Sequence, residues 1–305
     1  GPYHDYNLLC GCGYCKAMAS EVPVSARRLV VPAGALAAIE ARVIAWICRE
    51  EWRLEVFRTH GKIYEASASA MFHVPMAEVT KASPYRAKGK IAELALGYQG
   101  GEGALIRMGA LDMGLTLGEL NPLKDAWRAA NLKISGRSYR GEEPGLWEML
   151  DQACLRCVET KAPQDVVKGM RFRYDRGGLF LRLPSGRELC YVAPKVCEGD
   201  FGPEVHFWGQ NQMTKVWEEQ KLYGGRITEN ADQANCRDLL YHKLLRLEQE
   251  GLHHAVRFHV HDEAVPSFKI KDAPGMLKRV QDIFGEEVPW APGLPLAAAG
   301  FVTTR

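Results

Sequence analysis

The sequence predicts an α+β fold in which helices dominate the first half and antiparallel strands the second. Before residue 161, apolar residues recur at helical spacing, and helices are expected at 36–52, 63–72, 84–98, 104–111 and within 122–161. After residue 169, short alternating or apolar runs divided by turns predict antiparallel strands, at 170–174, 179–183, 188–192 and 204–208. One earlier strand is expected at 28–31, before Pro32.

The last third of the chain predicts a long helix, a hairpin and a final helix. The long helix is expected at 227–249, with Gly251 as its stop. Two β-type runs follow at 255–260 and 264–268, and the residues between them predict a hairpin. The last helix is expected at 274–284.

The composition is that of a folded protein without a membrane segment. Of its 305 residues, 47% are hydrophobic and 25% are charged, as in ordinary globular domains. A net charge of +2 neither indicates nor excludes nucleic-acid binding, because the patch that matters can be local. No apolar run reaches membrane-spanning length, and the N-terminus lacks a signal-peptide pattern. The protein is therefore expected in the cytoplasm.

The nine cysteines predict reduced thiols rather than a disulfide framework. Cys48, Cys190 and Cys236 stand singly in apolar contexts and are expected to be core thiols. Residues 1–26 show no periodicity and are expected to form a Cys- and Gly-rich appendage. Four soft ligands in it predict a possible zinc site, with a metal-free Cys-rich end as the alternative: His4, Cys10, Cys12 and Cys15.

The stretch 84–98 places four notable residues at intervals of four. These residues are Arg86, Lys90, Leu94 and Tyr98, which form one stripe on a helix. The cationic half suits phosphates, and the flat apolar half suits a base or sugar. The stripe therefore predicts a nucleoside triphosphate site. The alternative is a surface helix with a basic end and a buried aromatic residue.

An acidic pair, Asp262–Glu263, occupies the tip of the predicted hairpin. Like charges held together destabilise a fold unless a cation relieves the repulsion. Mg²⁺ is commonly held by one or two carboxylates and completed by substrate phosphates. The alternative is a solvated acidic turn. Together with the triphosphate stripe, the pair indicates nucleotidyl transfer.

Three stretches carry a resemblance to a known family: RAKGKIAELALGYQGG (86–101), FHVHDEAV (258–265) and ALAAIEARVIAW (35–46). Weaker matches keep the same order at 183–191, 224–240 and 290–296. On these residues the chain resembles the C-terminal half of a family A, DNA polymerase I-like enzyme of the phage type, over about residues 27–305. The resemblance implies a palm with an antiparallel sheet at 27–66 and 161–305 and helical fingers at 67–160. The family's thumb and exonuclease domains are not expected in this chain, so a partner chain is expected to supply a thumb.

The resemblance also implies roles for single residues. Arg86 and Lys90 would hold a deoxynucleoside triphosphate, with Leu94 under its sugar and base. The remaining implied roles are a residue near the templating position (Tyr98), a steric gate (Glu40), a minor-groove contact to primer-template DNA (Gln233), a Mg²⁺ ligand (Asp262) and its catalytic neighbours (Glu263, His261).

Three positions depart from the family's pattern. Ala35 replaces the first metal-binding aspartate, Ala37 replaces a serine, and Gln99 replaces a glycine and is expected to crowd the end of its helix. A two-ion Mg²⁺ site needs aspartates from both stretches, so an incomplete site is expected. The function implied is a polymerase-like protein with impaired chemistry in a bacterial or phage-infected cell. The alternative is a pseudoenzyme, a non-catalytic nucleic-acid-binding component of a replication or DNA-processing assembly.

Overall fold

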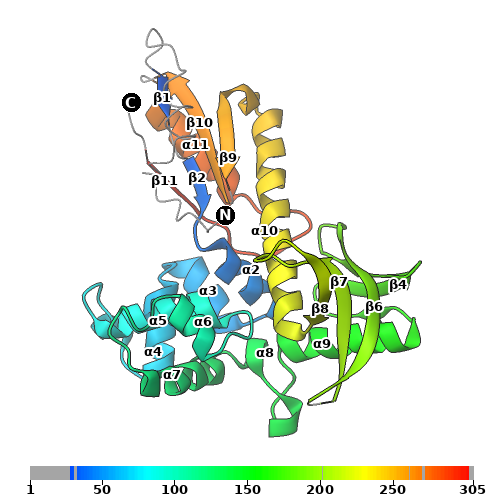
Figure 1. Cartoon of the computed structure of the whole chain (residues 1–305). Coiled ribbons are helices and arrows are strands. Elements are labelled where there is room, and N and C mark those ends of the chain that lie inside the picture. Colours follow the sequence, from blue (N-terminus) through cyan, green and yellow to red (C-terminus); the bar gives the residue numbers. More distant parts are fainter. Residues whose placement is uncertain (1–27, 31–32, 201, 261, 270–271, 302–305) are drawn as a thin grey trace.

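The computed structural model describes residues 28–30, 33–200, 202–260, 262–269 and 272–301. Two antiparallel sheets and a group of helices are arranged around one long helix, α10 (Gly224–Gln249) (Figure 1). This architecture confirms the predicted α+β class. The predicted appendage at 1–26, with its zinc ligands, and His261 lie outside the described residues.

Helices build the first half of the chain, as predicted. They are α2 (Ile39–Cys48), α3 (Glu51–Thr59), α4 (Ile63–Phe72), α5 (Pro84–Leu96), α6 (Glu102–Arg107), α7 (Leu117–Ala130), α8 (Leu132–Ser135) and α9 (Leu146–Thr160), with 3₁₀ turns at Met76–Glu78 and Ser138–Arg140. No helix in the described part of the chain combines the length and the apolar character needed to cross a membrane.

The prediction of a single helix at 36–52 was wrong. Residues 33–36 form a strand, α2 ends at Cys48, and α3 begins at Glu51. Arg49 adopts a left-handed conformation with φ 57°, and its N–H bonds to the carbonyl of Ala45. This C-terminal cap ends α2, although the apolar spacing continues past it.

Helix α5, which carries the predicted stripe, has local reasons for its start and its position. Pro84 occupies the first turn, and the side chain of Ser83 accepts a hydrogen bond from the N–H of Tyr85, which together fix the N-terminus. Gly89 faces α4 so closely that a Cβ there would lie 2.4 Å from the carbonyl oxygen of Tyr64. Glycine at this position therefore lets α5 pack directly on α4.

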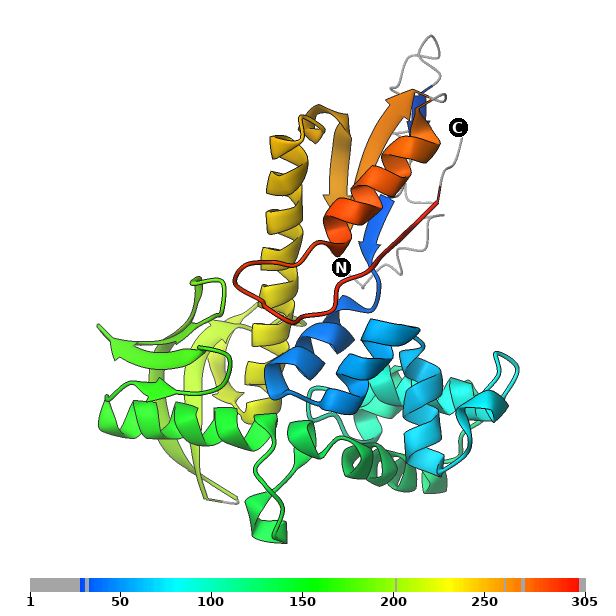
Figure 2. The same cartoon turned by 180° about the vertical axis from the view of Figure 1, so that it is seen from behind.

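A five-stranded sheet contains the predicted hairpin. Strands β1 (Arg28–Val30), β10 (Glu263–Lys269), β2 (Ala33–Leu36) and β11 (Ala298–Gly300) lie in that order, and β9 (Val256–Val260) pairs with β10 after a 3₁₀ turn at His253–Ala255. The hairpin β9–β10 confirms the prediction. Helix α11 (Ala273–Gly285) packs against this sheet (Figure 2).

The strands predicted after residue 169 form a second sheet. Its six strands run as an antiparallel meander, each paired with its neighbours in sequence: β3 (Gln164–Asp165), β4 (Arg171–Asp175), β5 (Gly178–Arg182), β6 (Glu188–Gly199), β7 (Gly202–Gln210) and β8 (Trp217–Leu222). Turns join these strands in order, so nearest neighbours pair. Helix α10 then carries the chain about 39 Å over 26 residues before β9 begins, and the two sheets stay separate (Figure 1).

The cysteine predictions are confirmed for two of three positions. Cys48 and Cys236 are buried free thiols. Cys190 is a free thiol but is exposed, which corrects its assignment to the core. Its neighbour Tyr191 on β6 is buried instead, because successive strand residues face opposite sides of a sheet.

Candidate functional site

A cleft of about 1100 Å³ opens where α2, α5 and α10 meet the β9–β10 hairpin, and strands of the six-stranded sheet form its remaining wall. Five of the predicted site residues line it: Glu40, Leu94, Tyr98, Gln233 and Asp262. They come from four separate stretches of sequence. Glu40, Leu94 and Gln233 are exposed, whereas Tyr98 and Asp262 are half-buried.

Asp262 lies beside the strand that carries position 35. Strand β2 pairs antiparallel with β10 through Ala33 and Ala264, and the N–H of Leu36 donates to the carbonyl of Asp262 at 3.2 Å. This hydrogen bond is one residue out of the Ala33–Ala264 register, so it sets Leu36, the residue after Ala35, opposite Asp262. The two places from which the family takes its metal-binding aspartates are therefore adjacent in this fold.

The donor set at this place fits only part of a two-ion Mg²⁺ site. Asp262 and Glu263 supply carboxylates, and position 35 supplies none. Mg²⁺ commonly needs one or two carboxylates plus phosphates from a substrate, but a two-ion site needs bridging ligands from both strands. Asp262 and Glu263 are therefore the carboxylates that could hold Mg²⁺ here, and the incomplete two-ion site stays a prediction.

Tyr98 is held by a buried acid that the sequence did not reveal. Its hydroxyl donates to Oδ2 of Asp232 on α10, and Asp232 is fully buried. The other oxygen, Oδ1, has no hydrogen-bond partner among the described residues. Burial raises the pKa of Asp232 well above its usual value, and the charge of Glu40 raises it further. The hydrogen bond to Asp232 therefore holds Tyr98 against α10.

One sequence signal could have found Asp232. It shares a helix face with Thr228, Asn235 and Leu239, all of which are buried, and residues three, four and seven apart lie on one face of a helix. A carboxylate in such a row is unexpected unless it has a partner. The spacing shows the anomaly, but it cannot name Tyr98 as that partner.

The floor of the cleft is acidic. Cys236 lies there, and its pKa is raised well above the ordinary value by burial and then by the charges of Asp232, Glu40 and Asp262. A thiol whose anion is disfavoured this strongly is a poor nucleophile and a poor metal ligand. Cys236 is a buried free thiol in the lining of the cleft.

Arg86 and Lys90, the cationic half of the stripe, lie outside the residues that line the cleft. Nε of Arg86 donates to Oε1 of Glu65 at 2.7 Å, and the guanidinium also lies over the ring of Tyr64. Burial would raise the pKa of Glu65, but the hydrogen bond and charge of Arg86 lower it overall. Lys90 is exposed. The stripe thus runs from solvent at Lys90 into the cleft at Tyr98.

A buried ion pair in the lining of the cleft anchors α5. Glu93 pairs with Arg53 of α3, whose side chain is 1% exposed, and Glu93 Oε1 also accepts from Ser67 Oγ at 2.8 Å and Trp127 Nε1 at 2.9 Å. Sequence reasoning did not single out this network. Its members come from α3, α4, α5 and α7, and no spacing rule connects them.

Gln99 links the end of α5 to the start of α10. It has φ 63°, a conformation that suits the family's glycine, and its Oε1 accepts a hydrogen bond from the N–H of Gly225 at 2.9 Å. The side chain therefore satisfies one of the unpaired N–H groups of the α10 N-terminus. Gln99 also packs closely on α10, since a Cβ at Gly225 would lie 2.4 Å from Gln99 Cβ.

Comparisons with known proteins give one relative in sequence and one in fold. No family model matches the chain. The DNA polymerase of Bacillus phage SP02 is 49% identical over 267 residues, which is 87% of this chain and 39% of that polymerase. The chain thus spans about two fifths of its relative's length.

A solved structure shares the fold. The POL domain of Pol1 from M. smegmatis, in complex with DNA primer-template and dNTP, matches with a TM-score of 0.55 and 16% identity. The match covers 92% of this chain and 40% of that one, and at this identity it speaks for the fold alone. The resemblance that the motifs implied is confirmed: over 87% of its length the chain is similar in sequence to a phage DNA polymerase, and it shares the fold of a polymerase domain.

Proposed function

We propose that this chain forms the nucleotide- and primer-template-binding part of a DNA polymerase. The observation that supports this most is the single cleft lined by Glu40, Tyr98, Gln233 and Asp262. Its phage relative is a DNA polymerase, and its structural neighbour is a polymerase domain in complex with primer-template and dNTP. Residues 27–66 and 161–305 would be the palm, and 67–160 the fingers.

The stripe on α5 would bind the nucleotide with its phosphates near solvent and its base inside the cleft. Arg86 and Lys90 would meet the triphosphate, which requires Arg86 to exchange Glu65 for a phosphate group. Leu94, which is 46% exposed, offers a flat apolar surface for the sugar and base. Tyr98 would lie near the templating base, held there by Asp232.

Residues of α2 and α10 in the cleft would select deoxyribose over ribose and contact the minor groove of the DNA. Glu40 is exposed at the start of α2, where a carboxylate would crowd a ribose 2′-hydroxyl. Gln233 is exposed on α10, and an amide there can pair with the acceptors that all base pairs present in the minor groove. We expect duplex binding by these residues to weaken as the salt concentration rises, because contacts to DNA phosphates release counterions.

Chemistry would be impaired because position 35 carries no carboxylate. Mg²⁺, when bound with the nucleotide, would polarise the phosphates at Asp262. Loss of one bridging aspartate is expected to cost several kcal/mol of transition-state stabilisation, and about 4 kcal/mol is already roughly a thousandfold in rate. The same observation favours a second candidate function, a non-catalytic component that binds primer-template DNA within a larger assembly.

Primer extension by the chain and by its Ala35→Asp variant tests the proposal. Each is compared with a matched version that also carries Asp262→Ala, and primer-template binding is measured by fluorescence anisotropy at several salt concentrations. We expect Ala35→Asp to extend a primer at least about a hundredfold faster than the chain itself, and Asp262→Ala to abolish the gain. Equal rates in both forms would refute impairment. DNA binding without extension in either form would favour the second candidate, and no DNA or nucleotide binding would refute both.

A further inference from the structure

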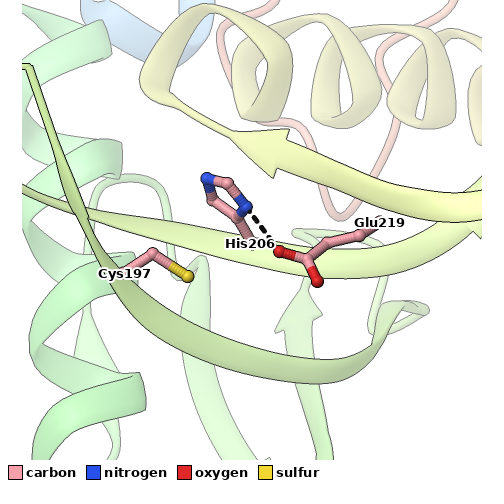
Figure 3. Close-up of side chains that lie close together, drawn as sticks. All are labelled: Cys197, His206 and Glu219. Atoms are coloured by element: carbon pink, nitrogen blue, oxygen red, sulfur yellow. Dashed lines mark hydrogen bonds and ion pairs between the residues drawn. The ribbon is translucent and has the colours of Figure 1, made fainter.

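The six-stranded sheet carries a cluster of three metal-ligand side chains away from the acidic hairpin. Cys197, His206 and Glu219 lie on the adjacent strands β6, β7 and β8 and are half-buried (Figure 3). Their sulfur, ring-nitrogen and carboxylate-oxygen atoms all lie within 4.8 Å of one another. Three ligand types from three neighbouring strands therefore converge on one point.

The strand register explains why these side chains meet. Cys197 pairs with Glu204, the residue two positions before His206 on β7, and Glu219 pairs with Trp208, two positions after it. Residues two apart on a strand face the same side, and diagonal neighbours lie within reach of one another. The cluster is thus built into the pairing of β6, β7 and β8.

The side chains of the cluster make the additional hydrogen bonds that usually orient metal ligands. His206 directs Nδ1 to Glu219 Oε1 at 2.8 Å and Nε2 to Glu204 Oε1 at 2.7 Å. Glu219 also bonds through Oε2 to Lys195 Nζ at 2.7 Å. A ligating histidine usually donates its second ring N–H to a carboxylate, and ligating carboxylates are themselves hydrogen-bonded. Glu204 and Lys195 supply these two supports.

We propose that Cys197 Sγ, His206 Nδ1 and Glu219 Oε1 bind a zinc ion, with a fourth position for water or another ligand. Thiolate, imidazole and carboxylate are the zinc ligands of proteins, and a thiolate disfavours Mg²⁺ and Ca²⁺. Zinc would bind the thiolate of Cys197 and an unprotonated Nδ1 of His206, so any protons on these two atoms are released to solvent on binding. Lys195 and Lys221 do not oppose it, because each is already paired with a glutamate.

Such an ion would brace one wall of the cleft. Phe207 and Gln220 pair across β7 and β8, directly next to His206 and Glu219 in sequence, and both line the cleft. Neighbouring strand residues face opposite sides, so the zinc site lies on the back of the surface that faces the cleft. Zinc would therefore cross-link the three strands without entering the cleft. The site stands apart from the proposed polymerase function.

Zinc content tests the proposal in a full-length chain in which Cys10, Cys12 and Cys15 are changed to serine, so that these thiols cannot bind metal. In this background we compare Cys197→Ser with Cys190→Ser, an exposed thiol on the same strand. After dialysis against trace zinc, we expect about one zinc per chain in the background and in Cys190→Ser, and less than about 0.2 in Cys197→Ser.

Two further measurements separate a site from unspecific thiol binding and from misfolding. Added zinc should raise the melting temperature of the background and of Cys190→Ser, but not of Cys197→Ser, because only binding to the folded state stabilises it. Bound Co²⁺ should give a thiolate charge-transfer absorption that disappears in Cys197→Ser while its metal-free circular dichroism stays native. Less than about 0.2 zinc in the background, or equal zinc in the two variants, would overturn the proposal.

Discussion

Changing Glu93 to glutamine should destabilise the chain strongly, because it breaks the buried pair that anchors α5. The side chains of Arg53 and Glu93 are 1% and 3% exposed. The pKa of Arg53 is raised overall: burial would lower it, but the charge and hydrogen bond of Glu93 outweigh that effect. Glutamine keeps the shape but removes the charge, and its amide NH₂ then faces a guanidinium that can only donate.

The cost follows from how little else neutralises the guanidinium. Arg53 keeps one other hydrogen-bond acceptor, Asn131 Oδ1 at 2.9 Å. Leaving one partner of a buried pair uncompensated costs about 3–5 kcal/mol. At roughly 2 °C per kcal/mol for a chain of this size, the melting temperature should fall by about 6–10 °C.

Thermal unfolding followed by circular dichroism measures this effect, and Glu51→Gln is the matched control. Glu51 pairs with Arg58 on α3, and these side chains are 70% and 42% exposed. Water already solvates that pair, so its loss should not move the melting temperature measurably. If Glu93→Gln shifts the transition no further than Glu51→Gln does, the buried pair does not anchor α5 and the reasoning is refuted.

Two other predictions concern the cleft. The pKa of Asp232 is raised in the folded state. Its contribution to the free energy of unfolding is therefore fully present below about pH 4 and is lost as the pH rises toward the folded-state pKa. Relative to Asp232→Asn, the free energy of unfolding should fall by up to about 1.4 kcal/mol per pH unit. Urea midpoints of both proteins between pH 5 and 8 measure this loss, and a constant difference would contradict it. Arg86→Ala should weaken deoxynucleotide binding about ten- to a hundredfold, as expected for lost hydrogen bonds to a charged group, whereas Glu65→Gln should not weaken it. Titration of a fluorescent deoxynucleotide distinguishes these outcomes, and equal affinities of the two variants would exclude Arg86 as a phosphate ligand.

Elements with strong local signals could be predicted from the sequence, and elements that depend on distant pairing could not. Helix α4 was predicted at its observed bounds because its apolar spacing and the flanking Gly61 and Pro75 agree. Strand β11 was missed because Ala298–Gly300 has no apolar alternation, and it becomes a strand by pairing with β2. Pairing of this kind is a tertiary effect.

The candidate site divides in the same way. The resemblance to the polymerase motifs predicted that Glu40, Gln233 and Asp262 belong to one site, and all three line the same cleft. Their roles stay predictions. Asp232 and the Cys197 cluster were missed because each depends on a partner from another helix or strand. Spacing rules identify the buried face of one helix or strand, but they do not predict which other helix or strand packs against it.

The charges of the cleft argue for a particular division between binding and chemistry. Glu40 and Asp262 line the cleft, and both raise the pKa of Cys236, so a triphosphate is repelled if its phosphates enter first. It is favoured if the base enters toward Tyr98 while the phosphates stay outside near Arg86 and Lys90, which is the direction of the α5 stripe. A second carboxylate at position 35 would add to the repulsion unless a cation offset it. Alanine at position 35 carries no charge, so this chain should bind a metal-free nucleotide at least as well as its Ala35→Asp variant while catalysing more slowly. On this reasoning, the substitution separates nucleotide affinity from turnover, and affinity alone cannot report whether the chain is an active polymerase.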